Sequence, residues 1–480
     1  MVAGVELHVS LVGRRDLAGE IYRQVRQAIV DGRLRPGEPL TPTRELAHRL
    51  SVARTTVTVA YDRLVGEGFA TSRVGAGTFV ADSVHRPGRR AHRKAGALRP
   101  RPVWDSIPLS NAFLARADFD FRTGLPDTTH FPFQTWRRLM AGELRVSAVG
   151  PGFYGHPAGH PALRDAIARH VTTSRGLTAS ADDVTVTNGT QQALDLIARV
   201  LVAPGEQVAV EDPGYPPPRW LFSSLGLRVS GVTVDDEGLV VDALPRNTRL
   251  VYVTPSHQYP LGMTMSLARR LELLAWADRH NAAIIEDDYD TEFRYGGRPL
   301  EPLHSLDTTG RTIYVGSFSK TMLTTLRIGF VISPPALLSA LHAAKYVTDW
   351  HTALPTQAAL ARFINEGLLA RHIRKMRAIY ERRHDSLLAG LAEHLHDHLA
   401  VIPAAAGLHV GTTARTLSPA QVAEVARRAI DDNVAVQHLA HCRIDQPARS
   451  GLALGYGAID ATNINQGLSR LRRCFDETLV

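Results

Sequence analysis

Apolar residues repeat at helical spacing near the start of the chain. The repeat predicts a helix over residues 14–33, with Asp16 as its N-cap and Gly32 at its end. A second, shorter helix is expected after Thr41 or Thr43, because either hydroxyl is a suitable N-cap. The repeating positions of the first helix are Leu17, Ile21, Val25 and Ile29.

The following stretch predicts a third helix and then a hairpin. The helix is expected to begin at Ser51 and to end at Gly66 and Gly68. Residues 69–72 and 78–80 favour strands, and the glycine-containing residues between them favour a turn. Three helices followed by a hairpin are typical of a winged helix-turn-helix domain, which binds DNA.

Farther along, short apolar runs end in polar residues and lead into loops or helical segments. Such runs cover residues 184–186, 208–210, 250–253 and 283–285. Apolar runs of this length predict buried parallel strands, and polar residues at their carboxyl ends face a crevice. We therefore expect a multidomain chain with an α/β body and a smaller C-terminal subdomain.

The strongest chemical signal lies in residues 316–320, which contain Ser317, Ser319 and Lys320 and are followed by Arg327. A partly buried lysine near a cation has a lowered pKa and forms a Schiff base with an aldehyde. Arginine binds phosphate through paired hydrogen bonds, and the two hydroxyls add donors. The pattern favours a phosphate-bearing aldehyde cofactor. The alternative is a surface lysine after a serine-rich turn.

Two further stretches favour the cofactor. The run at residues 283–285 leads to Asp287 and Tyr289, and a carboxylate there can pair with a protonated pyridine nitrogen. The electron-sink chemistry of pyridoxal phosphate (PLP) requires such a partner. At Gly189 and Thr190 a strand turns into a helix, whose first N–H groups are available to a phosphate.

Charge is concentrated at the front of a chain whose net charge is +8. Residues 1–81 hold 11 arginines against 8 acidic residues, and residues 82–101 hold 7 basic residues against Asp82. A basic front on a near-neutral body indicates a polyanionic partner for the front alone. Residues 82–115 are rich in Arg, Pro, Ala and Gly and predict a flexible basic linker. This linker either adds non-specific DNA affinity or is a plain spacer.

Composition narrows the class of protein. No apolar run is long enough to span a bilayer, so we expect a soluble, cytoplasmic protein without a membrane partner. The first ten residues lack the pattern of a signal peptide. Cys442 and Cys474 are too few and too far apart for a disulfide scaffold, and we predict no metal site.

The chemical motifs resemble the fold-type I aminotransferases, which are PLP-dependent. The resemblance implies that Lys320 forms the Schiff base, Asp287 holds the pyridine nitrogen and Tyr289 holds the ring hydroxyl. It also implies that Tyr215 stacks on the pyridine ring, and that Tyr154 reaches the phosphate of a neighbouring subunit, hence a homodimer. The residues assigned to the cofactor phosphate are Ser317, Ser319, Arg327, Gly189 and Thr190.

Residues 15–81 resemble the GntR-type DNA-binding domain. The matching motifs are Pro42-Thr43-Arg44-Glu45-Leu46-Ala47, Ala53-Arg54-Thr55-Thr56-Val57, Gly66-Glu67-Gly68-Phe69 and Gly75-Ala76-Gly77-Thr78-Phe79-Val80. The resemblance implies that Arg44, Arg54, Thr55 and Thr56 meet phosphates and base edges of double-stranded operator DNA. Arginine reads guanine in the major groove, and Gly75 and Gly77 allow the wing backbone to enter the minor groove.

The combination resembles the MocR subgroup of GntR regulators. Thr254-Pro255-Ser256-His257-Gln258 replaces the usual asparagine motif of the aminotransferases, so His257 or Gln258 takes the place of the asparagine on the ring hydroxyl. We expect a DNA-binding domain at 1–81, a linker at 82–115, a PLP-binding domain at 116–370 and a small subdomain at 371–480.

The substrate side departs from the aminotransferase pattern. Ala453 stands where an arginine normally binds the substrate carboxylate, and Pro217 supplies no arginine either. Arg449 and His409 are nearby candidates for contact with an effector. Three functions stay open: a PdxR-type regulator that senses PLP and controls vitamin B6 synthesis, a regulator of an amino-acid-like effector, and an active aminotransferase.

Overall fold

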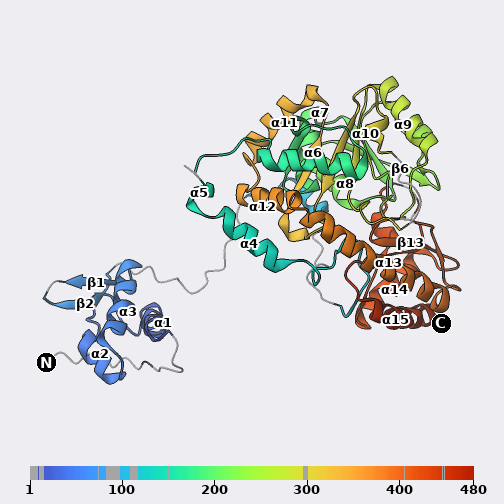
Figure 1. Cartoon of the computed structure of the whole chain (residues 1–480). Coiled ribbons are helices and arrows are strands. Elements are labelled where there is room, and N and C mark those ends of the chain that lie inside the picture. Colours follow the sequence, from blue (N-terminus) through green and yellow to red (C-terminus); the bar gives the residue numbers. More distant parts are fainter. Residues whose placement is uncertain are drawn as a thin grey trace. The chain divides into compact units, whose positions relative to one another are not determined.

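The structure is a computed structural model that describes residues 9, 16–73, 75–82, 98–108, 117–149, 152–295, 301–404, 406–445, 447 and 449–479. It contains two compact units, residues 1–100 and 101–480 (Figure 1). Much of the expected linker, including the basic residues 86, 89, 90, 93 and 94, lies outside the described residues.

The N-terminal unit has the predicted order of three helices and a hairpin (Figure 1). Asp16 caps the first helix, since its side chain accepts a hydrogen bond from the Gly19 N–H at 3.1 Å. Apolar residues from all three helices form one core, which includes Ile21, Leu46 and Leu64. The elements are α1 (Leu17–Val30), α2 (Thr43–Arg49), α3 (Arg54–Gly66), β1 (Ala70–Arg73) and β2 (Gly77–Val80).

Two helix starts differ from the sequence-based expectation. The third helix begins at Arg54 and not at Ser51, because Ser51 adopts a left-handed conformation (φ 53°) in the turn after α2. Neither Thr41 nor Thr43 caps α2, whose N-cap is Pro42 without a side-chain hydrogen bond. The turn between α2 and α3 is therefore longer than predicted, because α2 ends at Arg49 and α3 begins at Arg54.

An eight-stranded sheet organises the second unit. Its order is β4-β11-β10-β9-β8-β5-β6-β7, in which β11 is antiparallel to both neighbours and β7 is antiparallel to β6. The other neighbouring pairs are parallel, as the apolar runs predicted. The strands are β4 (Val184–Thr187), β5 (Gln207–Asp212), β6 (Arg228–Asp235), β7 (Gly238–Leu239), β8 (Thr248–Val253), β9 (Ala283–Asp288), β10 (Thr312–Ser317) and β11 (Gly329–Ile332).

Helices cover both faces of this sheet because successive strand residues alternate between apolar clusters on its two faces. Ile285 and Val315 pack with α7, α8 and α11, whereas Ile284 packs with α9 and Tyr314 packs with α6 and α12. The helices of this layer are α4 (Phe133–Glu143), α5 (Val146–Val149), α6 (Pro161–Arg175), α7 (Thr190–Leu201), α8 (Pro216–Ser224), α9 (Leu267–His280), α10 (Leu303–Leu306), α11 (Pro335–Thr348) and α12 (Leu354–Asn365).

The C-terminal part packs helices on a small sheet of order β12-β13-β16-β15 (Figure 1). A separate parallel pair joins β14 to β3, which comes from the start of the body. The boundary expected between residues 370 and 371 lies inside helix α13. The elements are α13 (Leu368–His394), α14 (Pro419–Asp431), α15 (Ala461–Leu479), β3 (Phe119–Asp120), β12 (Leu399–Val401), β13 (His409–Ala414), β14 (Val434–Ala435), β15 (Gln437–His438) and β16 (Leu452–Gly455).

A short 3-10 helix, Pro102–Ser106, lies within the segment expected to be a linker. Just before it, the Arg101 guanidinium donates to the carbonyl of Ser224, the last residue of α8, at 2.8 Å. The cation therefore lies at a helix C-terminus, where the dipole favours it. Across the described ranges, no helix has the length and apolarity needed to cross a membrane.

Candidate cofactor site and DNA-binding surface

Asp287 lies at the carboxyl end of β9 and is 3% exposed. Its Oδ2 accepts a hydrogen bond from the Tyr252 hydroxyl at 2.8 Å, while its buried Oδ1 has no hydrogen-bond partner. Burial raises the pKa of Asp287 to about 7. A buried carboxylate oxygen without a donor is costly, so the site is suited to a ligand that brings an N–H group.

Lys320 follows β10, the parallel neighbour of β9, so the lysine and Asp287 come from the same edge of the sheet. Its Nζ donates to the carbonyl of Gly124 at 2.7 Å, and burial lowers the pKa of the lysine. A Cβ at Gly124 would lie 3.1 Å from Nζ, and the glycine has φ 76°. The loop that contains Gly124 thus approaches the amine closely, which explains a glycine there.

The five residues assigned to the phosphate come from three loops. Gly189 N-caps α7 and Thr190 is its first residue, so the N–H groups of this turn are available to an anion. A Cβ at Gly189 would lie 2.9 Å from the Arg327 guanidinium, which places the arginine against this turn. Ser317 Oγ accepts from the Ser319 N–H at 3.1 Å. The structure brings Gly189 and Arg327 together, as a phosphate site requires.

Two tyrosines lie near the expected position of the cofactor ring. The Tyr289 hydroxyl donates to the backbone carbonyl of His257 at 2.8 Å. Tyr215 is the N-cap of α8, and its ring centroid lies 5.3 Å from that of Tyr259 in an edge-to-face arrangement. Burial raises the pKa of Tyr215 to about 12, so this phenol stays protonated at neutral pH.

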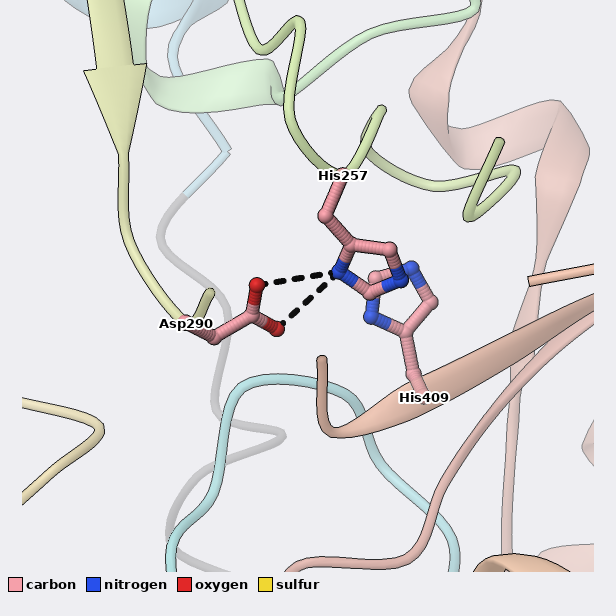
Figure 2. A group of neighbouring side chains, drawn as sticks. All are labelled: His257, Asp290 and His409. Atoms are coloured by element: carbon pink, nitrogen blue, oxygen red, sulfur yellow. Dashed lines mark hydrogen bonds and ion pairs between the residues drawn. The ribbon is translucent and has the colours of Figure 1, made fainter. Parts of the chain in front are cut away.

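His257 belongs to a buried group with Asp290 and His409 (Figure 2). Its Nδ1 lies 3.0 Å and 3.1 Å from the two Asp290 oxygens, and Asp290 Oδ2 also accepts the Leu408 N–H at 3.0 Å. The Nε2 atoms of both histidines are buried without a partner. Although the three side chains are of metal-ligand type, both carboxylate oxygens already have donors. We therefore interpret the group as an internal support for the loop that holds Tyr289.

Tyr154 lies on the surface, with 73% of the residue exposed. Its ring stacks on Trp350, with centroids 4.3 Å apart and planes 17° apart. An exposed position is compatible with the role that the resemblance implies, a contact to a neighbouring subunit.

On the substrate side, Ala453 is buried in the small sheet opposite Gly411 and Gln437. The Arg449 guanidinium donates to the carbonyl of Val234 at the end of β6, so it is engaged in holding the two sheets together. His409 is 2% exposed, and burial lowers its pKa well below the usual range. Neither residue offers the exposed cation that would bind a carboxylate.

The residues assigned to DNA lie at the starts of two helices and on the wing. Arg44 is exposed in the first turn of α2, and Arg54 and Thr55 are exposed in the first turn of α3. Arg54 Nε lies 3.4 Å from Thr43 Oγ1, which brings the two helix starts together. Thr56 follows on α3 and is half-buried, while Gly75 and Gly77 have φ 77° and 105° on the hairpin.

Comparisons with known proteins agree with this architecture. The family model "Bacterial regulatory proteins, gntR family" matches residues 17–80, and "Aminotransferase class I and II" matches residues 121–471. A relative from Rhizobium meliloti, "Probable rhizopine catabolism regulatory protein MocR", is 37% identical over 95% of this chain and 93% of its own length. The chain belongs to the MocR-type GntR regulators.

Other relatives extend the comparison of this MocR-type regulator. The "HTH-type pyridoxine biosynthesis transcriptional regulator PdxR" of Corynebacterium glutamicum is 31% identical over 94% of each chain. The kynurenine aminotransferase of Pyrococcus horikoshii, solved with PMP, has a TM-score of 0.70 at 28% identity, covering 82% of this chain and 98% of its own. LysN of Thermus thermophilus, complexed with N-(5'-phosphopyridoxyl)-L-leucine, has a TM-score of 0.70 at 26% identity and covers 78% and 98%.

Some residues that shape the site were not found from the sequence. Tyr252 binds Asp287, Gly124 accepts from Lys320, and Asp290 orients His257. Tyr252 lies in an apolar run, so its sequence position predicts a core residue. Gly124 is 196 residues away from Lys320 in the sequence, so no local pattern links the two. For Asp290 a signal existed, because this acidic residue follows the acidic carboxyl end of β9 by two positions.

Proposed function

We propose that this MocR-type regulator binds PLP, that its affinity for operator DNA changes when PLP binds, and that it controls genes of vitamin B6 synthesis. The observation that carries the proposal is the contrast within one crevice. Groups suited to each part of the cofactor are present, whereas Ala453 stands where the aminotransferase resemblance leads us to expect the substrate-carboxylate arginine. An alanine cannot replace a bidentate clamp, so the site favours holding the cofactor over processing amino acids.

Each cofactor residue has a defined task in this proposal. PLP supplies an aldehyde for Lys320 and a pyridine nitrogen whose proton pairs with the free Oδ1 of Asp287. Gly189, Thr190 and Arg327 bind the phosphate, with Ser317 and Ser319 adding hydroxyls. Tyr215 covers one face of the ring. Tyr289, with His257 behind it, lies on the side of the ring hydroxyl.

Regulation requires that PLP bind two states of the protein with different affinity. The N-terminal unit would provide the response, with Arg54, Thr55 and Thr56 at the major groove, Arg44 at the phosphates and the Gly75–Gly77 wing at the minor groove. A homodimer, with Tyr154 at the phosphate of the partner subunit, would present two such units to a two-fold symmetric operator.

Gel shifts test the proposal directly. DNA selected by the protein from a random pool serves as operator, and PLP is titrated against wild type and Lys320→Ala in parallel. We expect PLP to change the apparent affinity of wild type and to leave that of the variant unchanged. Identical binding of wild type at all PLP concentrations would refute control by PLP.

A second candidate keeps the cofactor but responds to an amino-acid-like effector. It is favoured by a polar cluster beside the ring site, where the Tyr259 hydroxyl lies 2.9 Å from Thr123 Oγ1 and 3.0 Å from Gln437 Oε1. Absorbance of the PLP-loaded protein separates the candidates. An effector-dependent change without turnover identifies this second candidate, and sustained conversion of amino acids identifies an aminotransferase.

A further inference from the structure

Glu211 is a fully buried acidic residue near the carboxyl end of β5, and the proposed function gives it no role. Its Oε2 accepts a hydrogen bond from the Thr254 hydroxyl at 2.6 Å and lies 3.4 Å from Gln258 Nε2. Its Oε1 is buried without a hydrogen-bond partner. Burying a carboxyl group with so few partners is costly, so this position requires a structural or functional reason.

Thr254 connects Glu211 to the backbone of Tyr259. A hydroxyl group has one proton, and Thr254 donates its proton to Glu211. The lone pairs of the hydroxyl stay available, and they accept the Tyr259 N–H at 3.0 Å. An acceptor at Glu211 therefore sets the direction of the Thr254 hydroxyl and, through it, the position of the Tyr259 backbone.

Gln258 ties the same loop to the loop that carries Tyr215. Its Nε2 lies 2.9 Å from the carbonyl oxygen of Pro213 and 2.7 Å from that of Tyr259, and its Oε1 accepts the Leu261 N–H at 3.1 Å. Pro213 comes two residues before Tyr215. Both polar ends of the Gln258 side chain thus hold the two loops together.

The ring of Tyr259 meets both tyrosines that the proposed function assigns to the cofactor ring. Its centroid lies 5.3 Å from that of Tyr215 and 6.4 Å from that of Tyr289, with interplanar angles of 75° and 73°. Its hydroxyl lies between Thr123 Oγ1 at 2.9 Å and Gln437 Oε1 at 3.0 Å. Edge-to-face ring contacts depend on the orientation of the rings, so a shift of Tyr259 would disturb both neighbours.

We propose that Glu211 is a positioning residue of the cofactor site, which fixes Tyr259 between the two tyrosines assigned to the cofactor ring. Glu211 acts through the Thr254 hydroxyl and the Gln258 amide. The inference rests on the proposed function, since it presumes that PLP occupies the site. Without the acceptor at Glu211 the Thr254 hydroxyl rotates, the Tyr259 loop loosens, and bound PLP lies in a less defined environment.

The test compares variants by absorbance titration with PLP, which gives affinity, and by the circular dichroism of bound PLP. Free PLP is achiral, so its circular dichroism reports how the protein orients the ring. Thr254→Val removes the hydroxyl and keeps the branched shape, while Glu211→Leu removes the acceptor. Thr248→Val is the matched control, because Thr248 is buried at the start of β8 and its hydroxyl has no hydrogen-bond partner.

In Thr254→Val and Glu211→Leu we expect the circular dichroism of bound PLP to fall. We also expect PLP affinity to weaken by about 2- to 12-fold, the range of one hydrogen bond. Glu211→Gln keeps an acceptor oxygen and should restore the wild-type spectrum, and Thr248→Val should leave it unchanged. Thr254→Val tests the inference even if Glu211→Leu fails to fold.

A double variant separates positioning from a general loss of stability. If Thr254 acts through Tyr259, Thr254→Val should add little to the loss of circular dichroism in Tyr259→Ala. Additive losses would overturn the inference, and so would a match of Thr254→Val and Glu211→Leu to Thr248→Val. If wild type shows no absorbance change with PLP, the proposed function itself fails and the inference fails with it, which is a distinct result.

Discussion

Arginines at the candidate DNA surface and arginines beside the main sheet of the body differ in their surroundings. In the DNA-binding unit Arg44 and Arg54 are exposed at helix starts. In the body Arg175 is 2.6 Å from Asp288, and Arg270 is fully buried with its guanidinium on backbone carbonyls. The two guanidinium groups of the first unit lie in water, where a partner can reach them. Arg44 and Arg54 are thus free to meet the DNA proposed as their partner, whereas Arg175 and Arg270 are engaged by groups of the body itself.

Replacing Lys320 with alanine gives the largest expected effect. It removes the amine that lies just after β10, so covalent retention of PLP should be lost completely. Absorbance after gel filtration and peptide mapping after borohydride reduction measure this loss. DNA binding without PLP should persist, because the N-terminal unit has its own core. Loss of that basal DNA binding would contradict the independence of the two units.

The pH dependence of stability sharpens the comparison on the body side. The pKa of Asp287 rises from 3.8 to about 7 in the fold, so the native state retains a proton that the unfolded chain releases. The contribution of Asp287 to the stability of the PLP-free protein should therefore be largest below about pH 4. As the pH rises to about 7, the free energy of unfolding should fall by up to about 1.4 kcal/mol per pH unit.

Melting temperatures of the PLP-free protein across this pH range check the sign. Asp287→Asn cannot ionise and should flatten the profile. Part of the slope should survive in the variant, because burial also raises the pKa of Glu211 to about 7. Equal profiles for wild type and variant would show that Asp287 does not hold the proton.

Arg54→Ala tests the exposed side of the comparison. Loss of a base or phosphate contact should weaken operator binding by about 1–3 kcal/mol and reduce its salt dependence. Fluorescence anisotropy at several salt concentrations measures both effects. Arg23, exposed on α1 and paired with Glu20, provides the matched control Arg23→Ala. A change in PLP affinity in Arg54→Ala, measured without DNA, would contradict the separation of the two surfaces.

Gly77→Ala should have the smallest effect. No atom lies within 4 Å of a Cβ added there, but φ is 105°, so the cost is conformational and about 1–2 kcal/mol. The wing should loosen and DNA affinity should fall less than in Arg54→Ala. Ala76→Ser is the neighbouring control. Unchanged anisotropy in Gly77→Ala would show that the wing does not contribute to binding.

Much of this architecture could be predicted because local signals agree with the fold. Apolar runs mark β9 and β10, and their parallel pairing brings Asp287 and Lys320 to one edge. The helical repeat predicted α1, and the glycine pattern predicted the hairpin. Contacts between residues that are far apart in the sequence have no such local signal. A lysine in a helical segment reads as solvent-exposed, so the burial of Lys345 on α11 could not be foreseen.

Helix ends were also hard to predict for a physical reason. Ser51 has the side chain of an N-cap, yet its backbone is left-handed and the chain turns for two more residues before α3 begins. Tertiary packing of the turn outweighs the local preference for capping. Helix α13 also runs through the boundary expected between residues 370 and 371.

The attachment of Arg101 to the last carbonyl of α8 has a mechanical consequence. That helix has nine residues, a rod of about 13 Å. The helix begins directly after Tyr215, which we expect to stack on the pyridine ring. The carbonyl of its last residue, Ser224, accepts the hydrogen bond from Arg101. Displacement of Tyr215 by a bound ring would therefore be felt, through one short helix, at Arg101, the first residue of the second unit.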